Sequence, residues 1–261
     1  MTESLELDGA GVVVTGAGHG IGRALATALV AAGARVVVND LDGDAVRSVA
    51  EEIGAHAAAG DAATERGVDA LVYEARAELG SIDVWFGNAG VDLGLGLDAT
   101  EDDWAASWQV NVMAHVRAAR RLVPHWLDHG GGRYVLTASA AGLLTMLGSP
   151  SYSVTKHGAV AFAEWLSATY RHRGIVVQAI CPQGVRTRML ADSGAVDLLS
   201  HDGALEPEEV AAAALDALDG DRFYVLPHPQ VADYYGARAT DPDRWLRGMN
   251  RLQQGLEGAQ A

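Results

Sequence analysis

The chain changes from a strand pattern to a helix pattern within GVVVTGAGHGIGRALATALVAAG, residues 11–33. Between the apolar run GVVVT and the helix pattern, Gly16, Gly20 and Gly22 are spaced as GxxxGxG rather than as the common GxGxxG. Glycines permit a tight turn and bring the backbone close to a pyrophosphate, and the helix that follows offers free N–H groups to it. Ordinary turns from strand to helix also contain glycines. The place of this cluster between strand and helix is what favours a nucleotide site.

An acidic residue ends the second apolar run, RVVVN at 35–39. Asp40 follows Gly22 by 18 residues, where a carboxylate can accept hydrogen bonds from the hydroxyls of an adenosine ribose. Asp40 would repel a 2′-phosphate, and no Arg or Lys stands beside Gly18 and His19 to hold one. The pattern therefore favours NAD(H) over NADP(H), although Asp40 is also compatible with a simple turn.

Apolar runs alternate with helix patterns along most of the chain. The predicted strands lie at 11–15, 35–39, 56–60, 82–87, 133–138, 175–181 and 222–226, and the clearest helix patterns at 20–33, 64–80 and 149–173. A further helix opens at Glu206-Pro207-Glu208-Glu209, with Pro near the first turn and acids at the positive end of the dipole. Strands that alternate with helices predict a parallel sheet covered on both faces. We expect one α/β domain over 1–261, doubly wound, with about seven strands.

Composition excludes several classes of protein. With 49% hydrophobic and 20% charged residues, the 261-residue chain is typical of a globular protein with a sizeable core. A net charge of -15 disfavours nucleic acid and anionic membranes, and the N-terminus has no signal-peptide pattern, so we expect a cytoplasmic protein. Nine scattered His residues predict no metal site. The one cysteine, Cys181, ends an apolar run and is expected to be a packed thiol.

The chain contains one lysine, Lys156, among 19 basic residues, and it follows Tyr152 by four positions in SYSVTK. At that spacing both side chains project from one face of a helix. A neighbouring ammonium lowers the pKa of a phenol, so we expect Tyr152 to serve as a general acid or base. A compact ammonium also suits a ribose hydroxyl better than a guanidinium does.

Several motifs together resemble the short-chain dehydrogenase/reductase family over about 190 residues. The nucleotide turn runs from Thr15 to Gly22, Asn88-Ala89-Gly90 follows the fourth strand, and Ser139 precedes Tyr152 by 13 residues. The resemblance implies a Rossmann-type fold with NAD as cofactor and Asn111, Ser139, Tyr152 and Lys156 as catalytic tetrad. The cofactor contacts that it implies are Thr15, Gly16, Gly18, His19, Gly20, Ile21, Gly22, Asp40, Asp61, Ala62, Asn88, Ala89, Gly90, Tyr152, Lys156, Pro182, Gln183, Val185 and Thr187.

The resemblance also implies a division of roles. Tyr152 exchanges a proton with the substrate oxygen, Ser139 hydrogen-bonds that oxygen, and Lys156 lowers the pKa of Tyr152 and holds the nicotinamide ribose. Asn111 positions a water that links Lys156 to solvent. Hydride moves between nicotinamide C4 and a carbinol carbon, so the expected reaction interconverts a secondary alcohol and a ketone without a metal.

The segments expected to bind the substrate depart from the family pattern in one place and otherwise say little about which substrate is bound. Gln183 stands where the family motif has glycine, and it either touches substrate or points away. Family members take specificity from the loop after Ser139 and from a segment that here spans 188–206. These regions offer the apolar residues Leu143, Leu144, Met146, Met189, Leu190, Leu198 and Leu199. They form either a pocket for a hydrophobic substrate or part of the core or a subunit interface. His201 and Asp202 are expected on the surface of this loop.

Assembly and two alternative functions complete the expectations. The family implies a homotetramer formed through the helix of Tyr152, where Ala159, Ala161, Phe162, Ala163, Trp165 and Leu166 are compatible with packing against a partner. The tail 241–261 predicts an amphipathic helix through Trp245, Leu246, Met249 and Leu252. The alternatives to an NAD-dependent alcohol dehydrogenase are an NADPH-dependent ketoreductase of carrier-bound thioesters or natural-product intermediates and a non-catalytic NAD(H) sensor. Asp40 opposes the ketoreductase, and the complete tetrad opposes the sensor.

Overall fold

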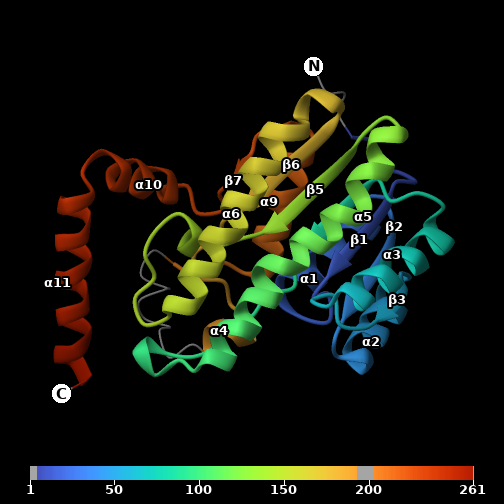
Figure 1. Ribbon diagram of the computed structural model, residues 1–261. Coiled ribbons are helices and arrows are strands. Elements are labelled where there is room, and N and C mark those ends of the chain that lie inside the picture. Colours follow the sequence, from blue (N-terminus) through green and yellow to red (C-terminus); the bar gives the residue numbers. More distant parts are fainter. Residues whose placement is uncertain (1–4, 193–202, 261) are drawn as a thin grey trace.

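The computed structural model describes residues 5–192 and 203–260 as a parallel sheet covered by helices (Figure 1). The strands lie in the order β3-β2-β1-β4-β5-β6-β7, and every neighbouring pair is parallel. Their bounds are β1 Gly11–Thr15, β2 Arg35–Asp40, β3 His56–Ala59, β4 Val84–Gly87, β5 Gly132–Thr137, β6 Ile175–Ile180 and β7 Tyr224–Val225. The predicted seven-stranded doubly wound sheet is confirmed.

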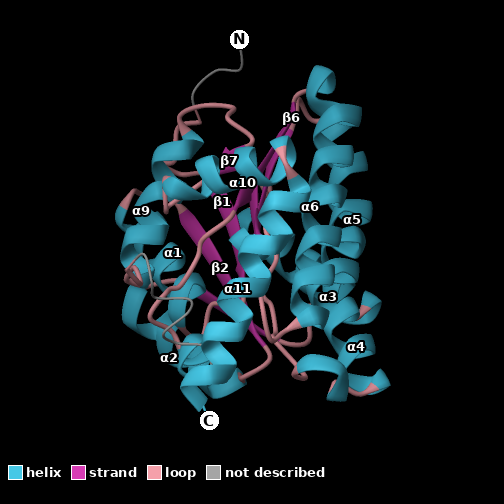
Figure 2. Cartoon of the chain, turned by 90° about the vertical axis from the view of Figure 1, so that its left-hand side faces the viewer, coloured by secondary structure: helices cyan, strands magenta, loops and turns pink. Residues whose placement is uncertain are grey.

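Helices cover both faces of the sheet, as Figure 2 shows. One layer contains α1 Gly20–Ala31, α2 Gly43–Ile53 and α9 Pro207–Leu218. The other contains α3 Glu65–Leu79, α5 Ala114–Asp128 and α6 Pro150–Tyr170, and the shorter α4 Glu101–Trp108 packs against α6. Pro207 and Pro150 each stand in the first turn of their helix, where a missing N–H costs nothing.

Two apolar cores lie on opposite faces of the sheet, and β1 contributes to both. Val12 and Val14 pack with Leu25 of α1, whereas Val13 faces the core built with α3, α5 and α6. All four side chains are fully buried. Burial on both faces explains why the strands are continuous apolar runs rather than alternating patterns.

The order of the strands creates a crevice outside the carboxyl ends of β1 and β4. The chain builds β1, β2 and β3 outward in one direction and then returns to place β4 on the other side of β1. Val14 lies opposite Val38 on one side and Phe86 on the other. Segments that follow β1 and β4 therefore diverge from one point, where doubly wound folds bind ligands.

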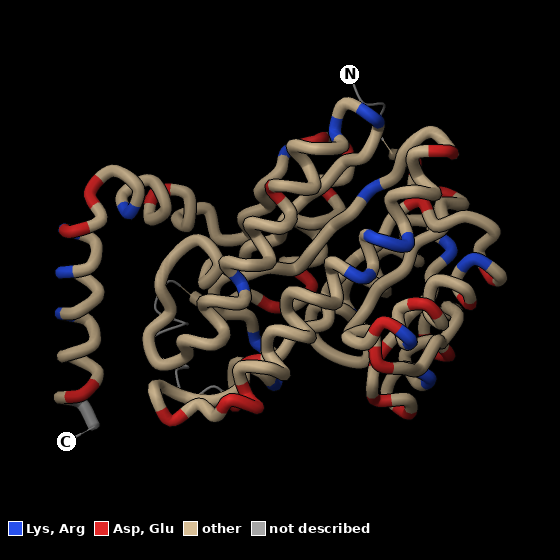
Figure 3. Tube along the Cα trace, in the orientation of Figure 1, with Lys and Arg blue, Asp and Glu red and all other residues tan. Residues whose placement is uncertain are grey.

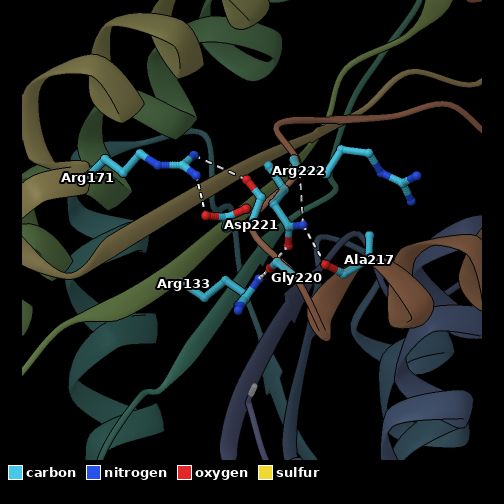
Figure 4. A network of polar contacts seen from close by, with 7 residues as sticks. Arg133, Arg171, Ala217, Gly220, Asp221 and Arg222 are labelled. Carbon is cyan, nitrogen blue, oxygen red and sulfur yellow. Dashed lines mark hydrogen bonds and ion pairs between the residues drawn. The ribbon is translucent and has the colours of Figure 1, made fainter. Parts of the chain in front are cut away.

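A polar network fixes edge strand β7 at the opposite end of the sheet (Figure 4). Gln178 donates to Ala217 O at 2.7 Å and to Arg222 O at 3.1 Å, while Arg133 donates to Gln178 Oε1 at 3.0 Å and to Gly220 O at 2.7 Å. Burial lowers the pKa of Arg133, although nearby carboxylates oppose this shift. The guanidinium of Arg133 thus ties β5 to β6 and to the connection that leads into β7, away from the crevice.

The C-terminal helices extend away from the sheet. α10 Gln230–Thr240 leads into α11 Pro242–Gln260, which Figure 1 shows standing apart from the sheet. The helix predicted in the tail is therefore present, and Trp245 lies beside Tyr234 of α10 with their ring centroids 6.4 Å apart. In the described parts of the chain, no helix has the length and apolar character to cross a bilayer.

Some predicted boundaries differ from the structure. β7 has two residues rather than five, and α6 ends at Tyr170, where a 3-10 turn over Arg171–Arg173 and Gly174 at φ +84° stop the helix. Residues 193–202 of the predicted substrate segment 188–206 lie outside the described residues. They include Leu198, Leu199, His201 and Asp202.

Candidate functional site

A cleft of about 470 Å³ occupies the crevice at the carboxyl ends of the strands. Most of the residues predicted for the site line it, namely Gly16, His19, Gly20, Ile21, Asp40, Asp61, Ala62, Asn88, Ala89, Gly90, Ser139, Tyr152, Lys156, Pro182, Gln183, Val185 and Thr187. Thr15, Gly18, Gly22 and Asn111 lie behind this wall instead. The fold thus joins seven separate segments of the sequence around one space.

The glycine turn requires glycine at two positions for steric reasons. Gly16 has φ +64°, and a Cβ on it would lie 2.8 Å from Ala89 Cα. A Cβ on Gly22 would lie 2.1 Å from Gly16 O. These contacts hold the turn against β4 and leave a cradle with the N-terminus of α1 at its edge, which fits a nucleotide diphosphate.

Thr15 and Asn88 join the ends of β1 and β4. Thr15 Oγ1 accepts hydrogen bonds from the backbone N of Asn88 at 3.0 Å and of Ala89 at 3.1 Å. Asn88 Nδ2 donates to Thr15 O at 3.1 Å and to Gly16 O at 3.2 Å. These residues shape the floor of the cleft, and Thr15 itself does not reach it.

Asp40 stands at the lip of the cleft and contacts the glycine turn directly. Its Oδ2 accepts a hydrogen bond from Gly18 N at 2.8 Å, and its Oδ1 accepts one from Asp42 N at 3.0 Å. Both bonds fix the carboxylate beside the turn. Leu41 next to it lines the cleft and is 76% exposed.

Tyr152, Lys156 and Ser139 meet at the other end of the cleft. Lys156 Nζ donates to Thr137 O at 2.9 Å and lies 5.5 Å from the centre of the Tyr152 ring. Ser139 accepts from Ala141 N at 3.1 Å and hydrogen-bonds the phenol of Tyr152. The hydroxyl groups of Tyr152 and Ser139, which can both take part in proton exchange, therefore lie together near the ammonium of Lys156.

The acidity of Tyr152 differs from the expectation. Burial raises its pKa to about 12, while the hydrogen bond with Ser139 lowers it and the charge of Asp92 raises it further. Burial also lowers the pKa of Lys156 to about 8. Desolvation thus dominates, and the phenol of Tyr152 stays protonated at neutral pH.

Asn111 lies in a π-helical turn, Gln109–Met113, and is fully buried. Its Oδ1 accepts from Val91 N at 2.9 Å, and its Nδ2 donates to Val91 O at 2.8 Å and to Thr155 Oγ1 at 3.0 Å. Such turns are common at functional sites. Asn111 holds the chain after β4 in place rather than lining the cleft, and the predicted water link to Lys156 stays a prediction.

Gln183 lines the cleft and also bonds to the start of α10. Its Oε1 accepts from Gln230 Nε2 at 3.2 Å, and its backbone N donates to His228 Nδ1 at 3.2 Å. The amide oxygen therefore points toward the C-terminal helices. This contact connects α10 to the loop after β6.

The apolar residues of the predicted pocket separate into two groups. Met146, Met189 and Leu190 line the cleft. Leu143 and Leu144 do not, because they are buried in the core that includes α6. For these two leucines the structure supports the second of the two alternatives, a place in the core.

The face of α6 predicted to meet a partner is also divided. Ala159, Ala163 and Leu166 are buried in the core of their own chain, so the prediction was wrong for them. Ala161 is exposed, and Trp165 is 55% exposed. Ala161, Trp165 and the partly buried Phe162 remain available to a partner.

The sequence interpretation missed two charged residues of the cleft, Asp92 and Arg188. Asp92 comes two residues after Gly90, and Arg188 directly follows Thr187, so proximity to recognised motifs was the available signal. Arg188 and His19 act on Asp42, whose pKa is lowered first by a backbone hydrogen bond from Ala45. Two basic groups thus face the mouth of the cleft.

Comparisons with known proteins agree with this architecture. The family model for short chain dehydrogenase matches residues 10–197. A 1-deoxy-11-beta-hydroxypentalenate dehydrogenase of Streptomyces avermitilis is 35% identical over 243 residues, 90% of each chain. A cyclohexanol dehydrogenase of an Acinetobacter species is 33% identical over 85% of this chain and 92% of the relative.

A solved structure is similar as well. A short chain dehydrogenase/reductase of Burkholderia phymatum, in complex with NAD, superposes with a TM-score of 0.84 at 29% identity, over 92% of this chain and 96% of that one. The chain belongs to the short chain dehydrogenase family of oxidoreductases. The predicted family is confirmed.

Proposed function

We propose that this protein is an NAD(H)-dependent oxidoreductase that interconverts a secondary alcohol and a ketone. The observation that carries the proposal is the meeting of Ser139, Tyr152 and Lys156 at one end of a cleft whose other end holds the glycine turn and Asp40. The dehydrogenase names of the relatives support the same class of reaction.

The cofactor would lie along the cleft between these two ends. The glycine turn and the N-terminus of α1 would bind its diphosphate, Asp40 its adenosine ribose and Asp61 its adenine. When bound, NAD supplies a hydride acceptor at nicotinamide C4. The NAD complex of the Burkholderia relative and the carboxylate of Asp40 both favour NAD over NADP.

Tyr152 would exchange the proton with the substrate oxygen. A pKa of about 12 keeps the phenol protonated, which suits reduction of a ketone, and alcohol oxidation would be faster at alkaline pH. Ser139 would donate to the same oxygen, and Lys156 would bind the nicotinamide ribose and favour the phenolate while it stays charged. Asn111 is a positioning residue in this scheme.

The test is turnover with NAD⁺ and NADP⁺ in parallel, measured by absorbance of the reduced nicotinamide on a panel of secondary alcohols that includes cyclohexanol. We expect turnover with NAD⁺, its loss in Tyr152→Phe, and unchanged NADH binding in that variant. Preference for NADP⁺ would contradict the role of Asp40. NADH binding without turnover of any alcohol or ketone would favour a sensor.

Assembly and location remain predictions. Exposed Val154 and Trp165 on α6 are compatible with the expected homotetramer. The expected cytoplasmic location and the absence of a metal are likewise untested. Gel filtration with light scattering would measure the assembly.

A further inference from the structure

Asp92 lies in the wall of the cleft beside the candidate catalytic residues, and the proposed proton transfer does not use it. The side chain is half-buried. Burial raises the pKa of its carboxyl, whereas Ser149 and the ammonium of Lys156 lower it. A carboxylate kept away from bulk water costs free energy unless it has partners. Because it lies beside the candidate catalytic residues, this carboxylate is a candidate for binding a ligand.

Two side chains fix the backbone on both sides of Asp92. Asn111 binds the N and O of Val91 at 2.9 and 2.8 Å, and Ser151 Oγ donates to Leu93 O at 2.6 Å. Asn111 and Ser151 are fully buried. The carboxylate is therefore held by supports that leave little freedom, as in a preorganised binding site.

Ser149 orients the carboxylate itself. It occupies the N-cap position of α6, where a serine usually accepts a hydrogen bond from the first turn of the helix. Here its side chain makes no such bond, and its Oγ donates to Asp92 Oδ1 instead. The buried hydroxyl is thus committed to Asp92 rather than to the cap.

The second carboxylate oxygen of Asp92 has no hydrogen-bond donor among the described residues. Within residues 5–192 and 203–260, Ser149 provides the one hydrogen bond to Asp92, at Oδ1. Oδ2 therefore accepts from water or from a ligand in the cleft. A carboxylate accepts strongly from hydroxyl groups, because hydrogen bonds to a charged acceptor are stronger than neutral ones.

Charge narrows the chemistry of that ligand. The segment from Asp92 to Asp103 carries five acidic residues and no basic one. Figure 3 shows acidic positions gathered where the chain enters α4. An anionic group next to Asp92 would be repelled. An ammonium would be attracted by Asp92 but repelled by Lys156, which acts on the same carboxyl. A neutral hydroxyl meets neither penalty.

We infer that Asp92, positioned by Ser149, recognises a second hydroxyl group of the substrate, which is then a neutral diol or hydroxyketone. Met146, Met189 and Leu190 supply an apolar wall for the rest of the molecule. The inference rests on the proposed function, because the first hydroxyl is the one that Tyr152 serves. A substrate without the second hydroxyl leaves a partly buried acceptor unpaired, and this is how polar sites discriminate.

The test compares kcat/KM for cyclohexanol, the 1,2-, 1,3- and 1,4-cyclohexanediols, 3-hydroxycyclohexanecarboxylate and 2-aminocyclohexanol. The variants are Asp92→Asn, Ser149→Ala and the matched control Asp98→Asn, an exposed aspartate six residues further along the same segment. We expect at least one diol to exceed cyclohexanol by about tenfold or more. Asp92→Asn should lower the ratio of kcat/KM for that diol to kcat/KM for cyclohexanol about tenfold. Ser149→Ala should lower this ratio less, and Asp98→Asn should leave it intact.

Several results would overturn the inference. One is a wild-type enzyme that prefers cyclohexanol, the hydroxycarboxylate or the amino alcohol to every diol. Another is equal loss of diol and cyclohexanol turnover in Asp92→Asn with a shifted pH profile, since that would mean action through Lys156. Thermal-shift titration with the diols in the presence of NADH separates the two proposals. If no alcohol turns over, selective stabilisation of wild type over Asp92→Asn keeps the site and rejects only the reaction, and no stabilisation rejects both.

Discussion

His115 should make the protein sensitive to mild acid, and replacing it by Phe should remove that sensitivity. The imidazole is buried beneath the end of β4, where a Cβ on Gly87 would lie 2.7 Å from its Nδ1. Its Nδ1 lies 3.3 Å from Tyr134 Oη, and within residues 5–192 and 203–260 its Nε2 has no partner. Burial, and secondarily the charge of Lys156, lower the pKa of His115 from 6.5 to about 3.

The direction and size of the effect follow from proton linkage. Between pH 6.5 and about 3, His115 is protonated in the unfolded chain but neutral in the folded protein. The free energy of unfolding therefore falls as the pH falls through this window. Protonation of His115 stabilises the unfolded state by about 2 kcal/mol more at pH 5 than at pH 7. His115→Phe keeps a ring of similar size that cannot bind a proton. This variant should therefore not lose the unfolding free energy that protonation of His115 costs the wild type.

The assay is urea unfolding at pH 7 and pH 5 at one protein concentration, for wild type, His115→Phe and the exposed control His172→Phe. Wild type and the control should lose about 2 kcal/mol more than His115→Phe between the two pH values. The comparison uses the difference between pH values, so imperfect packing of Phe does not affect it. Equal pH dependence in all three proteins would refute the reasoning.

Three further predictions follow from burial and close contact. Lys156→Met should abolish turnover and yet raise the free energy of unfolding at pH 7 by about 2 kcal/mol. Burial lowers the pKa of Lys156 to about 8, and removing this cost of burying the ammonium outweighs the lost hydrogen bond to Thr137 O. Equal or lower stability in urea unfolding would count against it. Cys181 should not react with a disulfide reagent at pH 8 until urea is added, since burial raises its thiol pKa to about 12, and fast labelling of the native protein would show the thiol to be accessible. Gly22→Ala should weaken NADH binding at least tenfold in a fluorescence titration, because its Cβ would lie 2.1 Å from Gly16 O; binding at the wild-type affinity would disprove the steric argument.

The sequence predicted most of the sheet because its central strands are buried on both faces. Runs such as GVVVT and IVVQAI contain one polar residue each, Thr15 and Gln178. Both are buried, so the runs could be recognised one at a time. The two-residue β7 was overpredicted because its neighbours in RFYVL, Phe223 and Leu226, are also apolar. Pairing with a single neighbouring strand limits its length, and no local pattern reports this.

The candidate site was predictable where its motifs have fixed spacing in the sequence. It was less predictable where burial in the folded protein decides the position or the pKa of a side chain. Leu143 and Leu144 look like pocket residues in the sequence, but the turn after Ser139 directs them into the core. The expected lowering of the Tyr152 pKa depended on the nearby lysine alone. Desolvation of both groups reverses it, and burial of that degree is a property of the fold. Asp92 was missed because its role depends on Ser149, 57 residues away.

The most direct test of the central claim follows a deuterium atom. The best secondary alcohol from the panel, labelled with deuterium at the carbinol carbon, is turned over with NAD⁺ in ordinary water, and the nicotinamide product is analysed by NMR. The account predicts one deuterium at C4 of the reduced nicotinamide for each ketone formed, and none when Tyr152 is replaced by Phe. Deuterium released into water, or ketone formed without labelled NADH, would contradict hydride transfer in this cleft.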